Sequence, residues 1–441
     1  MSPARSADCT MRDAPAADFT APPRGKGGGW AQRVQASKAV LGVRNPIREI
    51  TDSIKARPNP DKKPISLAVG DPTAFGMRPH GSALEEMARV AATGAHNGYT
   101  HSCGLPACRD AVATIHSVDG FPVDQDDVFI TAGCSQALQH AMASLARPGC
   151  NILLPRPGFP LYKTLCELYE IEARYYDLRS DRGWEMDTSQ LAGLTDDNTI
   201  ALMVCNPGNP TGHCYSRAHL EEMVGACEEL CLPIIADEVY EDMAFGRGAF
   251  VPVAAVSERV PVIHVGALSK KWLVPGWRLG WAVLHDRGGV LQAGRIVEAM
   301  EKLSQVTLGP NSLVQAAAPA MLFHTPTEFY TSTMATIQGG ARLCVERCQA
   351  VPGLECPSPP EGGMYILVRI VPGSLRGIAD DVAFSRELMA EEAVVVLPGA
   401  CFGAPGFVRL VVAASSPQLS EAWDRIESFC ARRFEGAVAG P

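Results

Sequence analysis

The chain has 441 residues, with 39 basic and 48 acidic side chains and a formal net charge of −9. This balance argues against a general nucleic-acid binder, because a phosphate backbone is bound by a basic surface. Apolar residues make up 46% and charged residues 20%, as in ordinary globular proteins. The length is enough for a large α/β domain with a smaller companion.

Targeting and membrane segments are not expected. No apolar run approaches the roughly 18–20 residues of a membrane helix, and the N-terminus lacks the continuous apolar stretch of a signal peptide. We therefore expect a soluble protein of the cytoplasm, or of an organelle. Residues 1–29 contain a PP pair and a GGG run but few large apolar groups, so we predict a disordered N-terminal tail.

The 15 cysteines are odd in number, and none of them forms a C-x-x-C pair. They are scattered through the predicted strands and helices. We interpret them as small buried apolar residues in a reducing compartment, rather than as metal ligands or disulfides.

A strand–helix alternation begins near residue 127. Strands are predicted over 128–131, 151–154, 172–178, 199–205, 233–236, 262–265 and 279–284, and helices over 135–146 and 217–230. Short apolar runs separated by helices indicate a mainly parallel sheet that is buried on both faces. The sequence therefore predicts a large α/β domain.

The pattern changes in the last third of the chain. Helices are predicted over 315–334, 336–351, 385–392 and 417–433, and strands over 364–370, 394–397 and 407–412. This order is typical of a smaller α+β domain. We predict four parts: the tail (1–29), an N-terminal arm that belongs partly to the small domain (30–75), the large domain (76–318) and the small C-terminal domain (319–441).

Two segments follow predicted strands, where parallel sheets place their ligands. Residues 131–135 (TAGCS) open a helix, whose N-terminal N–H groups suit a phosphate; a plain helix cap explains this segment equally well. Residues 206–212 (NPGNPTG) form a rigid loop that can hold the Asn209 amide in place. A simple turn remains the alternative for this loop.

Two further segments carry charge at strand ends. Asp237 ends an apolar strand and needs a cationic partner there, such as a protonated pyridine nitrogen, and Tyr240 can reach the same pocket. Lys270 follows another strand, and an enclosed lysine readily forms a Schiff base. Arg278 offers a fork for phosphate. Singly, such cations are more often solvated surface groups, but together the phosphate cradle, carboxylate and lysine match the needs of pyridoxal phosphate (PLP).

The order and spacing of these motifs resemble the fold-type I PLP-dependent aminotransferases. The motifs are NPGNPTG (206–212), ADEVY (236–240) and SKxWxxPGWRxG (269–280). Segments 45–48, 66–73, 131–138, 151–165 and 272–281 are similar to the tyrosine aminotransferase family, and the resemblance runs from about residue 30 to residue 430. It implies an aspartate-aminotransferase-like α/β fold, with a large domain built on a mainly parallel sheet and a smaller α+β domain. It also implies an enzyme that moves the amino group of tyrosine, or of other aromatic or neutral amino acids, to 2-oxoglutarate or pyruvate.

The resemblance assigns roles around the cofactor. Lys270 would hold PLP as a Schiff base and shuttle the reacting proton, and Asp237 would pair with the ring nitrogen. Tyr240 would donate to the phenolic oxygen beside Asn209. Phe159 would stack on the ring, although a core position is the alternative for this residue.

The phosphate and the substrate have their own predicted contacts. The phosphate would be held by Cys134, Ser135, Ser269 and Arg278, and by Tyr99 from the other subunit of a homodimer. Arg409 would bind the substrate α-carboxylate, next to Gly70 and Asn209. Tyr99 as an ordinary surface tyrosine and Arg409 as a structural ion-pair partner are the alternatives.

Three details qualify the resemblance. The spacing of eight residues to Arg278 favours Lys270 over Lys271 as the cofactor lysine. Ala267 stands where many relatives have a serine, so one phosphate hydroxyl is lacking. No motif-matched arginine binds a second carboxylate of the substrate; Arg295 is a candidate only by neighbourhood, and a solvated helix residue is the better interpretation.

Two rival functions remain at this point. A PLP-dependent lyase of the same fold, similar to a cystine lyase, would share the cofactor residues. A catalytically silent scaffold on this fold is disfavoured by the intact Lys270, Asp237 and Arg409. No metal is predicted.

Overall fold

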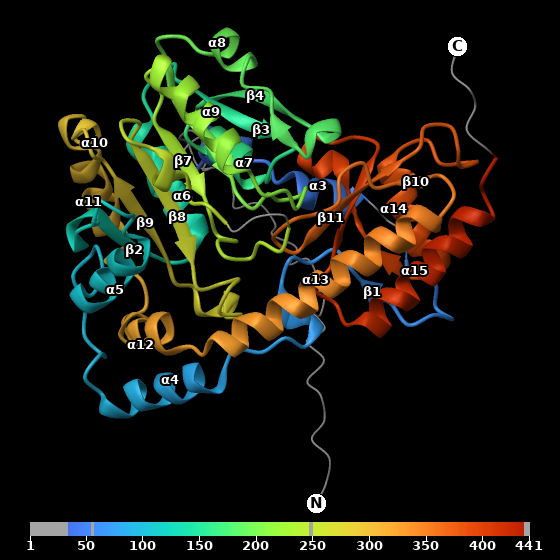
Figure 1. The fold of residues 1–441 in the computed structure, drawn as a ribbon, viewed down its shortest axis with the longest axis horizontal. Coiled ribbons are helices and arrows are strands. Elements are labelled where there is room, and N and C mark those ends of the chain that lie inside the picture. The colour runs from blue at the N-terminus through green and yellow to red at the C-terminus, as the bar shows by residue number, and fades with distance from the viewer. Residues whose placement is uncertain (1–33, 54–56, 247–249, 436–441) are drawn as a thin grey trace, which may run out of the picture.

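The computed structural model describes residues 34–53, 57–246 and 250–435. The tail predicted over 1–29 lies outside the described residues. The described chain forms a large sheet layered with helices and a smaller sheet beside it (Figure 1). The long helix α13 (Thr327–Ala350) runs from the first of these parts to the second.

The large sheet has eight strands in the order β2-β9-β8-β7-β6-β3-β4-β5. Their bounds are Val128–Thr131 (β2), Asn151–Arg156 (β3), Glu172–Arg179 (β4), Glu185–Met186 (β5), Thr199–Cys205 (β6), Ile234–Asp237 (β7), Val262–Ala267 (β8) and Gly280–His285 (β9). The central strands from β4 to β8 pair in parallel, whereas β9 is antiparallel to both of its neighbours and β5 is antiparallel to β4. The predicted, mainly parallel sheet is confirmed, and β5 is an addition to it.

Helices cover both faces of this sheet. On one face lie α6 (Cys134–Leu145), α7 (Leu161–Leu168) and α11 (Ile296–Thr307). On the other face lie α5 (Pro106–His116), α9 (Arg217–Glu229) and α12 (Ser312–His324). Successive side chains of a strand point to opposite faces, so β7 contributes Ile235 to the first core and Ile234 to the second. This burial on both sides explains why the strands read as unbroken apolar runs.

The smaller sheet has four antiparallel strands in the order β10-β11-β14-β13. Their bounds are Leu354–Glu355 (β10), Tyr365–Ile370 (β11), Leu397–Pro398 (β13) and Phe407–Val411 (β14). Helices α13, α14 (Asp381–Glu392) and α15 (Ser416–Ala431) pack their apolar residues into one core with these strands. Arg409 lies in the middle of β14, opposite Leu367 and Leu397. The predicted smaller α+β part is therefore present, and β14, one of its two central strands, carries a charged residue.

The prediction of one strand over 394–397 is wrong. The chain changes sheets at Val396: β12 (Val394–Val395) pairs in parallel with β1 (Ile65–Ser66), whereas β13 pairs with β14. The Leu67 N–H donates to the Val395 carbonyl at 2.8 Å and extends the first pairing. The N-terminal segment thereby joins the part of the molecule built from the C-terminal residues.

The predicted helix over 315–334 is also corrected. Helix α12 ends at His324, and α13 then runs without interruption through the boundary predicted near residue 335. Pro326 is the N-cap of α13, and Thr325 before it is extended. A proline lacks the N–H for a continuing helix and disfavours helical geometry in the preceding residue, so the break falls there.

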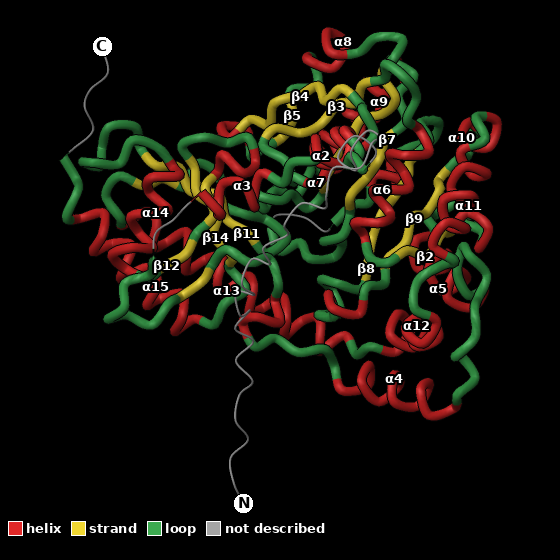
Figure 2. The backbone as a smooth tube through the Cα atoms, turned by 180° about the vertical axis from the view of Figure 1, so that it is seen from behind, coloured by secondary structure: helices red, strands yellow, loops and turns green. Residues whose placement is uncertain are grey.

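The first described helices lie against both parts of the molecule. Helix α2 (Lys38–Gly42) lies against α7, and α3 (Pro46–Ser53) lies against β13 and the turn before β14 (Figure 2). The remaining described helices are α4 (Gly81–Thr93), α8 (Gln190–Leu194), α10 (Val290–Ala293) and the short 3-10 helices η1 (Pro72–Phe75), η2 (Gln125–Asp127), η3 (Ser180–Arg182), η4 (Val253–Val256), η5 (Pro275–Trp277) and η6 (Gly399–Phe402).

Two further predictions concern burial and location. Ten of the fourteen described cysteines are buried, as expected for small apolar residues. No helix of the described chain is long and apolar enough to cross a membrane. The cytoplasmic location stays a prediction.

Candidate active site

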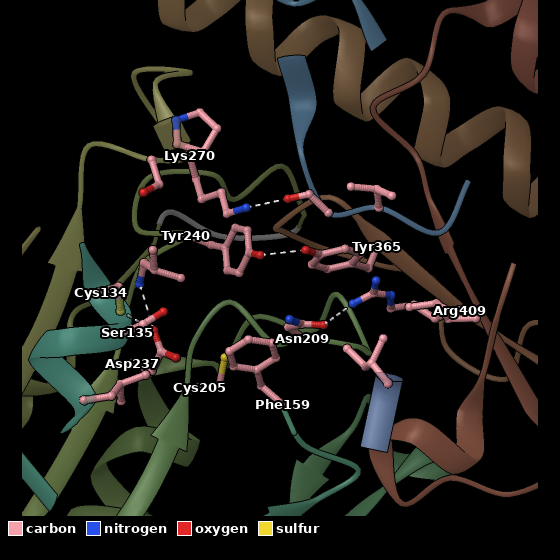
Figure 3. Close-up of a pocket in the computed structure, with 18 of the residues that line it drawn as sticks. Cys134, Ser135, Phe159, Cys205, Asn209, Asp237, Tyr240, Lys270, Tyr365 and Arg409 are labelled. Atoms are coloured by element: carbon pink, nitrogen blue, oxygen red, sulfur yellow. Dashed lines mark hydrogen bonds between the residues drawn. The ribbon is translucent and has the colours of Figure 1, made fainter. Parts of the chain in front are cut away.

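A cavity of about 500 Å³ lies where the ends of β6, β7 and β8 face the start of α6 and the middle of β14. A volume of this size suits a small molecule. Every residue predicted for the site lines the cavity except Tyr99: Gly70, Cys134, Ser135, Phe159, Asn209, Asp237, Tyr240, Ser269, Lys270, Arg278 and Arg409. Figure 3 shows Asp237, Cys134 and Ser135 at one end of the cavity and Arg409 at the other.

The start of α6 forms an anion site. The N-cap Gly133 has a φ of +85° and no side-chain cap, so the N–H groups of Cys134 and Ser135 stay available. Arg278 donates from Nη2 to the Ala132 carbonyl at 3.0 Å and from Nη1 to the Pro275 carbonyl at 2.8 Å. A Cβ at Gly133 would lie 2.4 Å from Arg278 Nη2. Only glycine therefore lets the guanidinium lie against the helix start.

Asp237 is a buried carboxylate at the end of β7. Its Oδ2 accepts from the Tyr162 hydroxyl at 2.7 Å, and its Oδ1 accepts from the Cys134 thiol at 3.5 Å. Burial raises the pKa of Asp237 because the charged form is desolvated, and the Tyr162 hydrogen bond partly offsets this rise. Within the described chain no cationic side chain forms an ion pair with Asp237, which leaves the carboxylate available to a bound cation.

Lys270 is the lysine that reaches the cavity. Its Nζ donates to the Gly70 carbonyl at 2.5 Å and lies 5.9 Å from the centre of the Tyr240 ring. Lys271 points elsewhere: its Nζ pairs with Asp242 at 2.5 Å and lies over the rings of two aromatic residues. The geometry thus agrees with the choice of Lys270 made from the spacing.

Two tyrosines connect the two ends of the cavity. The hydroxyls of Tyr240 and Tyr365 are 2.8 Å apart. The ring of Tyr365 lies 4.2 Å below the guanidinium of Arg409. A Cβ at Gly70 would lie 2.2 Å from the Tyr365 hydroxyl, so this close approach requires glycine at position 70.

Arg409 is a buried cation without a carboxylate partner in the described chain. Its Nη1 donates to Asn209 Oδ1 at 2.9 Å and its Nη2 donates to the Ala68 carbonyl at 2.7 Å, while Nε has no partner. Burial lowers the pKa of the guanidinium, because the charge is desolvated. A carboxylate in the cavity would supply the missing partner.

The residues present fit PLP. An uncapped helix start with Arg278 suits the phosphate, the buried Asp237 suits a ring cation, and Lys270 reaches into the same cavity. This combination is the chemistry that the sequence motifs predicted.

Residues 62–426 match the family model described as aminotransferase class I and II. The chain belongs to this family. Tyrosine aminotransferase from Mus musculus is 42% identical over 394 residues, which cover 89% of this chain and 86% of the mouse chain. The crystal structure of tyrosine aminotransferase from Leishmania infantum has a TM-score of 0.86 at 33% identity, covering 91% of this chain and 99% of that one. Alanine aminotransferase from Pyrococcus furiosus has a TM-score of 0.84 at 31% identity, covering 90% of this chain and 100% of that one.

The protein is therefore a PLP-dependent aminotransferase of fold type I, which acts on amino acids and 2-oxo acids. Because the chain belongs to this family of enzymes, the alternative of a catalytically silent scaffold is rejected. Tyr99 lies on the surface of this aminotransferase, 92% exposed, and Arg295 is also on the surface, paired with Glu298. A role for Tyr99 at a cofactor would thus require a second subunit.

The sequence reasoning missed Tyr162 and Tyr365. Tyr162 lies three residues after Phe159 in the segment 151–165, so its helical position was the available signal. Tyr365 carried no signal of its own, because it begins β11 in an apolar run. Ile47 and Arg48 of the NPIR segment also line the cavity, from α3.

Proposed function

We propose that this aminotransferase moves the amino group of tyrosine, and of other aromatic or neutral amino acids, to a 2-oxo acid such as 2-oxoglutarate or pyruvate. The observation that carries the proposal is the buried Arg409, whose Nε lacks a partner beside the cavity. It suits the α-carboxylate that amino acids and 2-oxo acids share. The apolar side chains of Ile47, Val69 and Leu397 line the cavity as well, which favours apolar substrates.

The proposed roles follow from the contacts. When bound, PLP supplies an electron sink for the electrons of the bond broken at the substrate Cα. Lys270 Nζ is the proposed point of covalent attachment and the group that moves the Cα proton. Asp237 holds a proton at the ring nitrogen, and Tyr240 donates to the phenolic oxygen from a position fixed by Tyr365. Phe159 covers the ring beside Tyr162.

The remaining proposed contacts fix the ends of cofactor and substrate. Cys134, Ser135, Ser269 and Arg278 bind the phosphate. Arg409, Asn209 and Gly70 receive the substrate carboxylate group. Supporting this, the Arg409–Asn209 hydrogen bond and the Lys270–Gly70 hydrogen bond both face the cavity.

We also propose a homodimer in which Tyr99 reaches the phosphate of the neighbouring subunit. Tyr99, Val306 and Leu308 are large and more than half exposed. Gly309, which follows Leu308, packs on the backbone of Ser102, so these exposed groups belong to one region. Such a surface is typical of an interface. Sedimentation of the holoenzyme at the mass of one chain would contradict the dimer.

The division into domains is part of the proposal. The N-terminal arm (30–75) contributes a part of the smaller domain, residues 319–441 form the rest of that domain, and residues 76–318 form the larger one. The pairing of β1 with β12 supports the place of the arm.

The absorbance spectrum of the PLP-loaded enzyme tests the function. Tyrosine alone should convert the absorbance of the bound cofactor from its aldehyde form to its amine form, and 2-oxoglutarate should restore it. If tyrosine leaves the spectrum unchanged while alanine converts it, the proposed donor is wrong. Continued release of ammonia and a 2-oxo acid without an acceptor would instead identify the lyase alternative.

A further inference from the structure

Two histidines and a glutamate form a compact group next to strands β7 and β8, outside the proposed cofactor cavity. His116 ends α5, Glu241 follows β7 in the turn after Tyr240, and His264 lies in β8. The Glu241 Oε2 atom is 3.5 Å from His116 Nδ1 and 3.8 Å from His264 Nε2. One nitrogen or oxygen from each residue lies within 4.8 Å of the others. Three side chains that metals favour thus converge from three separate elements.

This group is distinct from the cofactor cavity. In the parallel pairing of β7 with β8, Val265 is opposite Asp237 and His264 is opposite Ala236. Paired residues share a face and successive residues alternate, so His264 points to the face opposite Asp237. None of the three clustered residues lines the cavity.

The hydrogen bonds of His264 orient it as a ligand. Its Nδ1 lies 2.7 Å from Glu238 Oε2, and the other oxygen of Glu238 accepts from the Val253 N–H at 2.8 Å. Beside this fully buried carboxylate, Nδ1 is the nitrogen that carries the proton. Nε2 then faces Glu241, and this buried atom has no hydrogen-bond partner. A carboxylate on the far nitrogen is the usual support of a metal-binding histidine.

The charges also favour a cation. Glu238 is completely buried and Glu241 nearly so, and both acidic side chains face His264. The positive charge of Lys271 acts on Glu241 as well, although its Nζ is paired with Asp242. Buried charges of one sign are costly unless a counter-charge is present, and one divalent ion offsets two of them.

We propose that His116, Glu241 and His264 form a binding site for a divalent cation of the zinc class. Nitrogen and oxygen ligands about 2.0–2.1 Å from zinc lie roughly 3.3–3.5 Å apart in a tetrahedral site. The two separations from Glu241 Oε2, 3.5 and 3.8 Å, come within a few tenths of an ångström of that range. Water completes the fourth position, and the ion enters past the side chains of His116 and Glu241, which are 8% and 12% exposed.

The bound ion would stabilise the fold and would not contact the reacting atoms. It ties the end of α5 to the turn that carries Tyr240 and to the strand that leads to Lys270. We expect the ion to raise the Tm of the holoenzyme and to change kcat by less than about twofold. Because the site does not use the cofactor groups, its existence is independent of which amino acid is the substrate.

Metal content tests the proposal. The holoenzyme is treated with chelator, loaded with Zn²⁺ and passed through a desalting column before elemental analysis. Wild type should retain one zinc per chain, whereas Glu241→Gln and His116→Gln should retain less than a tenth of that. The matched control is His219→Gln, since His219 is another buried histidine near glutamates, Glu185 and Glu222, but its Nε2 already accepts from the Met186 N–H. This control should retain one zinc.

Co²⁺ provides a second measurement that needs no variant. Bound at two imidazoles, a carboxylate and water, it should give the intense visible absorption of a four-coordinate ion. Wild type that retains no zinc, or a zinc ion that survives in Glu241→Gln, overturns the proposal; the latter result would place the ion on the cofactor phosphate or on thiols. If the variants do not fold, a wild-type cobalt spectrum without four-coordinate bands overturns it equally.

Discussion

The side chains of Arg409 and Asn209 connect the two sheets of the molecule by a hydrogen bond of 2.9 Å. Arg409 lies on β14 of the smaller sheet, and Asn209 lies in the loop after β6 of the larger one. Neither sheet alone could hold both groups at the cavity. The proposed carboxylate site therefore depends on how the two parts pack.

Replacing Arg409 tests this site. Arg409→Ala should raise KM for every amino acid and 2-oxo acid, because the α-carboxylate is common to all of them. A charge-assisted hydrogen bond contributes about 1.5–3 kcal/mol, so kcat/KM should fall roughly 10- to 100-fold. Steady-state kinetics with tyrosine, alanine and 2-oxoglutarate measures the effect. A loss confined to tyrosine would contradict the assignment.

The two adjacent lysines form a matched pair. Lys270→Ala should lower transamination by roughly 10³-fold or more, because it removes the attachment point and the proposed base. Lys271→Ala should keep most of the activity, since that side chain pairs with Asp242 outside the cavity. Turnover measured on both PLP-loaded variants decides between them. Activity that survives in Lys270→Ala and is lost in Lys271→Ala would reverse the assignment.

Tyr162→Phe tests the hydrogen bond to Asp237. Burial raises the pKa of Asp237 and the Tyr162 hydroxyl lowers it, so the variant should have a still higher Asp237 pKa. The ring cation binds the carboxylate form, which is lost as the pH falls through that pKa. The Kd of PLP should therefore begin to rise at a higher pH in the variant, and be about tenfold weaker in acid solution. Identical pH profiles for the two proteins would rule out this coupling.

Local signals predicted most of the large sheet. Strands such as β6 and β8 are mainly apolar runs of seven and six residues that are buried throughout, so their composition and length identify them without tertiary information. Lys270, Asp237 and Arg278 could be predicted because PLP needs a lysine, a carboxylate and a phosphate-binding cation. These residues follow predicted strands, in motifs whose order and spacing resemble the family. The tyrosines were harder, because an aromatic residue in an apolar run has a core position as its simplest reading.

Pairing between strands that are far apart in the chain could not be predicted from the sequence. Strand β1 has two residues, and its partner β12 lies more than 300 residues later, so neither has a periodic signal of its own. The group around His264 was missed for the same reason: its members come from α5, β8 and the turn after β7, and each histidine alone is ordinary. Only the packing of α5 against the sheet brings His116 within 4.3 Å of the His264 ring centre.

A surface ion pair gives the stability a defined pH dependence. The Glu391 carboxylate accepts hydrogen bonds from Arg433 and Arg432, which lower its pKa from 4.5. A carboxyl group with a lowered folded pKa stabilises the protein above pH 4.5, and this contribution is lost as the pH falls through the folded value. Glu391→Gln should lower the Tm at pH 7 by about 1–2 °C, a small effect because the pair is partly exposed. The difference from wild type should shrink as the pH falls below 4.5 and vanish once the pH is below the folded pKa of Glu391, and a difference that does not shrink in acid would refute the ionic origin.

Gly133→Ala tests the anion site at the start of α6. With φ at +85° and ψ at 167°, this position is strained for any residue with a Cβ, by roughly 1–3 kcal/mol. The new Cβ would also displace the Arg278 guanidinium, because it would lie 2.4 Å from Nη2. PLP and inorganic phosphate should both bind about 10- to 100-fold more weakly. The matched control is Gly276→Ala on η5, beside Arg278, where nothing lies within 4 Å of the added Cβ. Equal losses in the two variants, measured by fluorescence titration with PLP, would show that the helix start does not bind the phosphate.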